Sequence, residues 1–180
     1  MNLYDLNNDI IIMNIDGIDI EMKPAICFGK VFDKWLVSKC GKVWSLHFKR
    51  IVEGRKSWYN TKDGADRLTY VHLDISTPLG FWGDGSGYLP KYPQANVTRR
   101  SIKKHKLVMD TWKPLYDNPP EGIVWEEWEI VRDLPTVYNH ISKTIVIDHI
   151  DDDVTNNRLD NLRRVTSWDN QHSRKAKGLK

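Results

Sequence analysis

The stretch IDHIDDDVTNNRLDNLRRVT, residues 147–166, decides how this sequence is interpreted. A short apolar run, residues 145–147, leads into an Asp-His pair at positions 148 and 149. Such a run predicts a β-strand, and successive side chains of a strand point to opposite sides of the backbone. Asp148 can therefore hold a metal ion while the imidazole of His149 reaches a different atom nearby.

The residues that follow this pair predict a second strand and a closing helix. Val165 and Thr166 are strand-like, and Ser167 is a suitable N-cap for a helix over 168–176. Asn170 lies in the first turn of that helix, where its amide offers a second oxygen ligand. A carboxylate and an amide oxygen suit Mg²⁺, Mn²⁺ or Ca²⁺ and leave coordination positions for water and phosphate oxygens. With an imidazole to take a proton from water, this set predicts phosphodiester hydrolysis.

The pattern D-H-I-D-x-D-x-x-N-N-x-x-x-N-L-R-x-V-T, which starts at Asp148 and is followed by Asn170, resembles the HNH nucleases with a ββα-metal fold. It is most similar to their phage and intron-encoded homing-endonuclease branch. The resemblance implies that Asp148 and Asn170 bind the metal and that His149 is the general base. It also implies that Asn161 ties the loop to the backbone and orients the histidine. His172 is a weaker candidate ligand, because two helical residues separate side chains by about 200°.

Two upstream segments also resemble parts of that family. Residues 35–46, WLVSKCGKVWSL, are similar to a small modular DNA-binding segment that often precedes these nucleases. Residues 104–108, KHKLV, are similar to a helical segment that packs beside the active site. Within it, His105 packs against the nuclease core or touches DNA, and we favour packing. Residues 116–143 form a long acidic insertion relative to compact members.

The remainder of the chain predicts β-strands, two helices and a long loop. An Asp-Gly pair at 16–17 between two β-rich runs is a strong hairpin signal. The other expected strands lie at 35–37, 42–46 and 68–75, the helices at 98–112 and 121–134, and a Gly- and Pro-rich loop at 76–97. We therefore expect an α+β fold, with a mainly antiparallel N-terminal β region with helix and a C-terminal ββα-metal HNH module. The expected divisions are 1–97 for the β-rich DNA-binding region, 98–144 for a helical connector with the acidic insertion, and 145–180 for the nuclease module.

Composition restricts the class of protein. The chain has 180 residues, of which 40% are hydrophobic and 28% charged, as in globular proteins. No apolar stretch approaches the length of a membrane span, so we expect a soluble protein without membrane contact. Cys27 and Cys40 lack C-x-x-C spacing and indicate neither a zinc module nor a disulfide framework. These features favour a reduced, cytoplasmic setting, which is that of a bacterial host if the gene belongs to a phage.

The net charge of +3 is compatible with DNA binding but is a weak argument for it. The distribution of basic residues is more informative, because one group at 99–106 and another at 158–180 flank the candidate metal site. The residues predicted to contact DNA are Lys42, Lys104, Arg163, Arg164, Arg174 and Lys175. For Arg163, a phosphate contact and a brace for the site are equal alternatives. For Lys42, the alternative is a solvated surface residue.

Together these features predict a metal-dependent endonuclease that acts on double-stranded DNA, with Mg²⁺ as the expected metal and Mn²⁺ as a substitute. One site per chain predicts nicking by a monomer, or a double-strand break only through dimerisation. A first alternative is a DNA-binding protein whose nuclease site has degenerated, although every functional position of the pattern is filled. A second is an RNA-binding or phage structural accessory protein, which would lack the metal site and prefer single strands.

Overall fold

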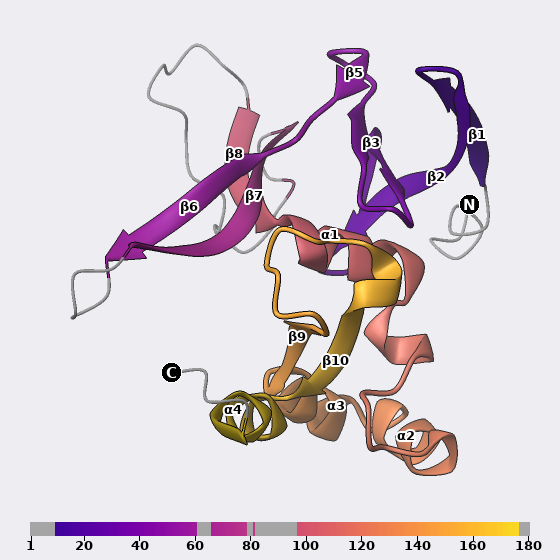
Figure 1. Ribbon diagram of the computed structural model, residues 1–180. Coiled ribbons are helices and arrows are strands. Elements are labelled where there is room, and N and C mark those ends of the chain that lie inside the picture. The colour runs from indigo at the N-terminus through magenta and orange to yellow at the C-terminus, as the bar shows by residue number, and fades with distance from the viewer. Residues whose placement is uncertain (1–9, 61–65, 79–80, 82–96, 177–180) are drawn as a thin grey trace.

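The computed structural model describes residues 10–60, 66–78, 81 and 97–176, and only the backbone of 59–60, 66–69 and 174–176 (Figure 1). Its N-terminal part is an antiparallel sheet with the strands in sequence order. These strands are β1 Ile11–Ile15, β2 Ile18–Cys27, β3 Lys30–Ser38, β4 Val43–Ser45 and β5 Arg50–Ile51. The predicted hairpin is confirmed, because Asp16 and Gly17 join β1 to β2 with φ angles of 56° and 81°, as a tight two-residue turn requires.

A second antiparallel sheet follows, in the order β6-β7-β8. Its strands are β6 Arg55–Asn60, β7 Asp66–Pro78 and β8 Val97–Lys103. The sequence predicts helix from residue 98, and this part of the prediction is wrong. Helix α1 spans only Lys104–Trp112, because Ile102 and its neighbours pair with β7, where Ile102 lies opposite Leu73. Of the loop predicted at 76–97, residues 76–78 belong to β7, and 79–80 and 82–96 lie outside the described residues.

Helix α1 lies between the two sheets and the C-terminal hairpin (Figure 1). Leu107 of α1 is fully buried in a cluster that also contains Val37 of the first sheet, Leu73 of the second and Leu162 of β10. A helix buried on both sides is apolar on more than one face, and α1 accordingly buries Leu107, Val108 and Met109 in succession. One hydrophobic core therefore fixes the N-terminal sheets relative to the C-terminal hairpin.

The acidic segment after α1 forms two helices where the sequence predicts one. A short 3-10 helix, Leu115–Asp117, precedes α2 Trp125–Arg132 and α3 Pro135–Ser142. Pro135 ends the predicted helix over 121–134 and starts α3, because proline is tolerated in the first helical turn but not in the interior. Trp128 is fully buried and its indole donates to the carbonyl of Tyr116 at 3.1 Å, which anchors α2.

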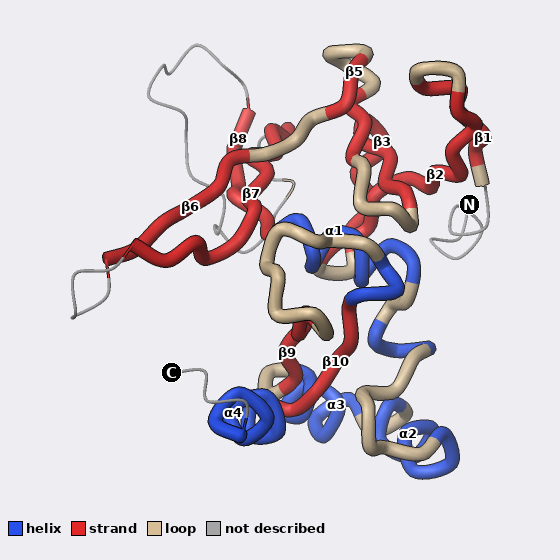
Figure 2. Tube along the Cα trace, viewed as in Figure 1, coloured by secondary structure: helices blue, strands red, loops and turns tan. Residues whose placement is uncertain are grey.

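The C-terminal hairpin and helix agree with the prediction in type and order. Strand β9 Ile145–His149 pairs antiparallel with β10 Leu162–Thr166, and α4 Ser167–Ala176 closes the unit. Figure 2 shows the connection between β9 and β10 as a long loop that rises toward α1, with α4 at the opposite end of the hairpin. Thr166 caps α4 in place of Ser167, because the backbone N–H of Asp169 donates to Thr166 Oγ1 at 3.0 Å. The predicted α+β fold class is confirmed, and among the described residues no helix is long and apolar enough to cross a membrane.

Candidate active site

The Asp-His pair closes strand β9. Asp148 lies opposite Arg163 of β10, and His149 lies opposite Leu162. The Asp148 carboxylate is mostly buried, with 14% of its side chain exposed, and its Oδ2 accepts from Nε and Nη2 of Arg163 at 3.0 Å each. Arg163 also donates through Nη1 to Glu121 at 3.1 Å. Of the two alternatives for Arg163, this geometry favours the brace.

Asn161 holds the loop between β9 and β10 closed. Its side-chain oxygen accepts from the backbone N–H of Asp151 at 3.1 Å, and its amide donates to Asp151 Oδ1 at 2.8 Å and to the carbonyl of Asn156 at 2.9 Å. The backbone N–H of Ile150 donates to the carbonyl of Asn161 at 2.9 Å. These bonds join both ends of the loop, as expected of a residue that ties it to the backbone, but none of them reaches the ring of His149.

Asn157 is the amide that contacts the histidine. Its Oδ1 lies 3.4 Å from Nε2 of His149, and Asn157 is buried, with 5% of its surface exposed. Asn157 is not among the site residues that the sequence predicts. The Asn-Asn pair at 156–157 is a signal in the sequence, but it does not reveal which of the two amides turns inward.

Aromatic rings surround His149, which is itself only 3% exposed. His149 and His105 of α1 form an edge-to-face contact, with ring centroids 5.1 Å apart. The ring of Tyr70 in β7 stacks on His149, with ring centroids 6.2 Å apart. His105 therefore packs against His149 of the C-terminal hairpin, which agrees with the packing alternative that the sequence favours. Burial lowers the pKa of His149, although the bond with Asn157 and nearby carboxylates oppose the shift. Burial and the neighbouring His149 lower the pKa of His105 to about 3, so both rings are neutral near pH 7.

Asn170 supplies a buried acceptor from the first turns of α4. Its Oδ1 is inaccessible to solvent and has no hydrogen-bond partner among the described residues. A buried oxygen without a donor is costly, and a hard cation would satisfy it, so the residue fits a metal ligand. Within the described part of the chain, no group of three or more His, Cys, Asp or Glu side chains could hold a metal. The two predicted ligands, the Asp148 carboxylate in β9 and the Asn170 amide on α4, supply oxygen atoms of the kind that hard cations prefer.

Comparison with known proteins identifies the segment that carries these residues. A family model described as HNH endonuclease matches residues 140–172. The match covers 33 of the 180 residues, and the matched segment is here called the HNH module. No curated protein matches the chain. A solved structure on DNA binding and cleavage by the HNH homing endonuclease I-HmuI matches with 20% sequence identity and a TM-score of 0.39. The match covers 80% of this chain and 53% of that one, so the protein spans about half the length of its structural match.

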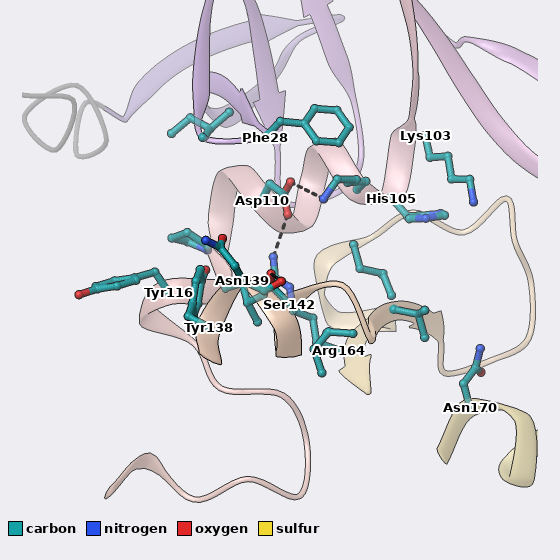
Figure 3. Close-up of a pocket in the computed structure, with 18 of the residues that line it drawn as sticks. Phe28, Lys103, His105, Asp110, Tyr116, Tyr138, Asn139, Ser142, Arg164 and Asn170 are labelled. Atoms are coloured by element: carbon teal, nitrogen blue, oxygen red, sulfur yellow. Dashed lines mark hydrogen bonds and ion pairs between the residues drawn. The ribbon is translucent and has the colours of Figure 1, made fainter. Parts of the chain in front are cut away.

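A cleft of about 860 Å³ opens beside the HNH module (Figure 3). One wall comes from Tyr70, Lys103 and His105, and the other includes Ile147 and Asn170. Figure 3 shows the Asn170 side chain reaching from α4 toward the cleft. His172, the weaker candidate ligand, stacks instead on Trp168 with ring centroids 3.6 Å apart, and its Nδ1 donates to the carbonyl of that residue at 2.8 Å.

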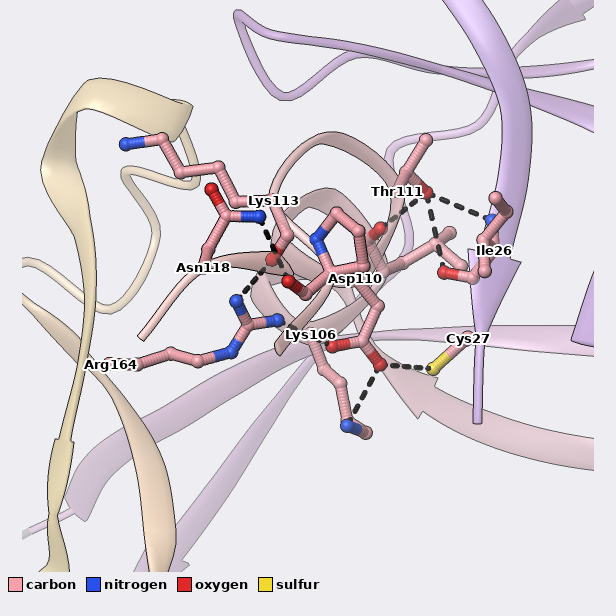
Figure 4. Close-up of polar contacts among 10 residues, drawn as sticks. Ile26, Cys27, Lys106, Asp110, Thr111, Lys113, Asn118 and Arg164 are labelled. Atoms are coloured by element: carbon pink, nitrogen blue, oxygen red, sulfur yellow. Dashed lines mark hydrogen bonds and ion pairs between the residues drawn. The ribbon is translucent and has the colours of Figure 1, made fainter. Parts of the chain in front are cut away.

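Two of the basic residues predicted to contact DNA, Arg164 of β10 and Lys104 of α1, are buried. The Arg164 side chain is only 4% exposed, and its guanidinium bonds to Asp110 at 3.0 Å and to the carbonyl of Lys113 (Figure 4). The Lys104 side chain is 10% exposed and its ammonium lies 3.6 Å from Glu53. Neither charge can reach a phosphate without leaving these contacts, so the expectation of DNA contact is corrected for both.

The other predicted DNA contacts differ in how well the structure describes them. Lys42 is half-buried in the turn before β4, and its backbone N–H donates to Ser38 Oγ at 2.8 Å. The side chains of Arg174 and Lys175 lie outside the described residues. The neighbour of Lys104 is better placed than Lys104 itself. Lys103 is exposed, lines the cleft, and holds its ammonium 4.2 Å from the centre of the Tyr70 ring.

Proposed function

We propose that this protein is a metal-dependent endonuclease that hydrolyses phosphodiester bonds of double-stranded DNA. The observation that carries the proposal is the Asp148–His149 pair at the end of β9, inside the HNH module, with the carboxylate braced by Arg163. The unsatisfied buried oxygen of Asn170 supports it, because that atom lacks any partner within the described residues.

His149 is the proposed general base. Its burial disfavours the charged imidazolium, so the ring is free to accept a proton from a water molecule near pH 7. The rings of Tyr70 and His105 hold the imidazole plane and exclude bulk water from that side. A base that is fixed in place and neutral favours proton transfer. The imidazole of His149 then needs neither to rotate nor to lose a proton before it accepts one from water.

Asp148 and Asn170 are the proposed metal ligands, with Mg²⁺ expected and Mn²⁺ accepted. A bound divalent cation would stabilise charge on the phosphate and on the departing 3′ oxygen. Arg163 orients the Asp148 carboxylate through a hydrogen bond to Oδ2. Residues that hydrogen-bond to a metal ligand in this way usually raise the affinity for the metal. Asn161 keeps the loop folded against β9, and this holds the side chains of Asp148 and His149 at the end of the strand in a fixed geometry.

The N-terminal region, residues 1–97, is proposed to contact the DNA duplex, with residues 98–144 as connector and 145–180 as nuclease module. Lys103 replaces Lys104 as the proposed phosphate contact next to the cleft, because the residue is exposed and its ammonium lies near the Tyr70 ring beside His149. Lys42 and the tail residues Arg174 and Lys175 stay in the proposal as further phosphate contacts. One site in the chain suits nicking by a monomer, and a double-strand break would need two copies.

Conversion of supercoiled plasmid to nicked or linear DNA tests this function. The wild-type protein with Mg²⁺ or Mn²⁺ should convert the plasmid, and EDTA should stop the conversion. Asp148→Ala and Asn170→Ala should lose the activity, whereas Asp160→Ala should retain it, since that exposed carboxylate pairs with Arg158 on the surface of the loop. Retarded migration of DNA without cleavage would support the degenerate DNA-binding alternative instead. Cleavage that persists in EDTA would contradict the metal assignment.

A further inference from the structure

The side chain of Asn157 has two polar neighbours, and together they determine which way its amide faces. Its Nδ2 donates to the backbone carbonyl of Thr155 at 2.8 Å. Its Oδ1 lies 3.4 Å from Nε2 of His149. A backbone carbonyl can only accept, so the NH₂ group must point at Thr155 and the oxygen must point at the imidazole. The reversed amide would place two acceptors against each other.

This orientation restricts the proton on the imidazole. The amide oxygen of Asn157 carries no hydrogen, so a bond between it and the ring requires that Nε2 of His149 be the donor. A neutral imidazole has only one N–H, and the other nitrogen carries the lone pair. The neutral ring therefore holds its proton on Nε2 and presents Nδ1 as the basic atom.

We propose that Asn157 is a positioning residue that holds His149 in the Nε2-protonated tautomer and leaves Nδ1 to accept a proton from the attacking water. The inference rests on the proposed role of His149 as general base. The family resemblance assigns the orienting role to Asn161, but the bonds of Asn161 go to Asp151 and to the carbonyl of Asn156. The two asparagines therefore have different roles. Asn161 closes the loop, and Asn157 determines which nitrogen of the His149 ring carries the proton.

The N-terminal sheet fixes the backbone of Asn157. The turn after β3 packs against the loop, and the backbone N–H of Leu159 donates to the carbonyl of Lys39 at 2.8 Å. In the same turn, a Cβ added to Gly41 would lie 2.7 Å from the carbonyl oxygen of Asn157, and Gly41 has a φ of +82°. Only glycine fits at this position, so the turn can press directly on the residue that contacts His149.

Nitrogen-15 NMR of the histidine side chains tests the proposal without DNA or metal. In protein labelled at histidine, the His149 signal (identified by its absence in His149→Gln) should show a protonated Nε2 and a lone pair on Nδ1. Asn157→Ala should shift the ring toward a mixture of tautomers. Asn157→Asp should keep the wild-type tautomer, because a carboxylate oxygen can still accept from Nε2. Asn156→Ala is the matched control, because its amide contacts Asp151 and not the ring.

The outcomes separate this inference from the proposed function. A wild-type His149 protonated on Nδ1, or a tautomer unchanged in Asn157→Ala, would overturn the inference. Because the wild-type spectrum alone tests the tautomer, an Asn157 variant that fails to fold does not remove the test. With plasmid DNA, Asn157→Ala should lower the cleavage rate by about tenfold or more at unchanged metal affinity, and Asn157→Asp should recover part of it. If the wild-type protein cleaves no DNA, the proposed function fails while the tautomer is still measured.

Discussion

Arg163 holds Asp148 through two nitrogens, Nε and Nη2, each 3.0 Å from the same carboxylate oxygen, Oδ2. The two residues face each other across the β9–β10 hairpin, so the pairing register itself brings them together. Glu121 accepts the third contact of the guanidinium at 3.1 Å. Both contacts with Asp148 use its Oδ2, which leaves Oδ1 for the proposed metal. The hairpin thus orients a ligand before any cation arrives.

Removing that brace should weaken metal binding. In Arg163→Ala, the Asp148 carboxylate loses its fixed orientation and its partner charge, and we expect the affinity for Mn²⁺ to fall by about tenfold or more. Calorimetric titration of Mn²⁺ into the DNA-free protein measures the change without relying on cleavage. Arg158→Ala is the control, because Arg158 forms a similar ion pair with Asp160 on the exposed loop. An unchanged Mn²⁺ affinity in Arg163→Ala would contradict the brace.

Arg164 should matter for stability and not for DNA contact. Its guanidinium is buried against Asp110, which also accepts from Lys106 at 2.9 Å and lies 3.5 Å from the Cys27 thiol (Figure 4). Arg164→Met leaves a partly buried carboxylate without its main partner, so the free energy of unfolding should fall by about 3 kcal/mol or more. Urea denaturation measures this, and Arg158→Met should shift the midpoint far less. If both variants unfold at the same urea concentration, Arg164 is not the structural residue described above.

The contact between the turn after β3 and the loop that joins β9 to β10 can be tested with two glycines of nearly identical backbone. Gly41 and Gly17 have φ angles of +82° and +81°, but a Cβ at Gly17 would meet nothing within 4 Å. Gly17→Ala should therefore cost about 1 kcal/mol from the left-handed backbone alone. Gly41→Ala should cost about 1–3 kcal/mol more, because the added methyl collides with the Asn157 carbonyl. Thermal unfolding of the two variants gives the difference, and equal losses would argue against the close contact.

Acid should destabilise the fold through His105. Burial, His149 and the cations Lys103 and Lys106, together with His72, lower the pKa of His105 to about 3, below the usual value of 6.5. Between these two pH values the unfolded chain takes up a proton that the folded protein does not, so stability falls as pH decreases. For this group alone the loss at pH 5 is about 2 kcal/mol, and none is expected above pH 7.

The variant His105→Gln isolates this contribution. The fall in melting temperature between pH 7.5 and pH 5.0 should be smaller in His105→Gln than in the wild type. A remainder is expected, because burial also lowers the pKa of His149 and adds a loss of the same sign. If the two proteins lose the same number of degrees, then His105 is not a neutral buried residue.

The sequence was most informative where neighbouring residues determine the structure. The Asp-Gly turn at 16–17 and the β9–β10–α4 unit were predicted because turn chemistry, alternation and capping act over a few residues. Strand β8 is not predicted, because the position of Ile102 fits the apolar face of a helix as well as a strand. Only its pairing with Leu73 of β7 shows that the segment is a strand. Helix α3 lies outside the helix predicted at 121–134, and its start depends on Pro135, which a first helical turn tolerates.

At the site, the sequence predicts the residue types but not their surroundings. Arg164 looks like any other basic residue near the pattern, and its burial depends on Asp110, 54 residues earlier in the chain. Similarly, Asn156 and Asn157 are adjacent and identical in type, but only Asn157 contacts His149, and its backbone packs against the distant turn that contains Gly41. Such contacts between distant segments determine roles that no local pattern encodes.

The most direct test of the central claim is the cleavage of supercoiled plasmid by His149→Ala under single-turnover conditions with Mg²⁺. We predict that the wild-type protein nicks the plasmid, that His149→Ala loses the activity by about a hundredfold or more, and that His140→Ala, an exposed histidine on α3, retains it. Cleavage by His149→Ala at the wild-type rate would contradict the assignment of His149 as the general base.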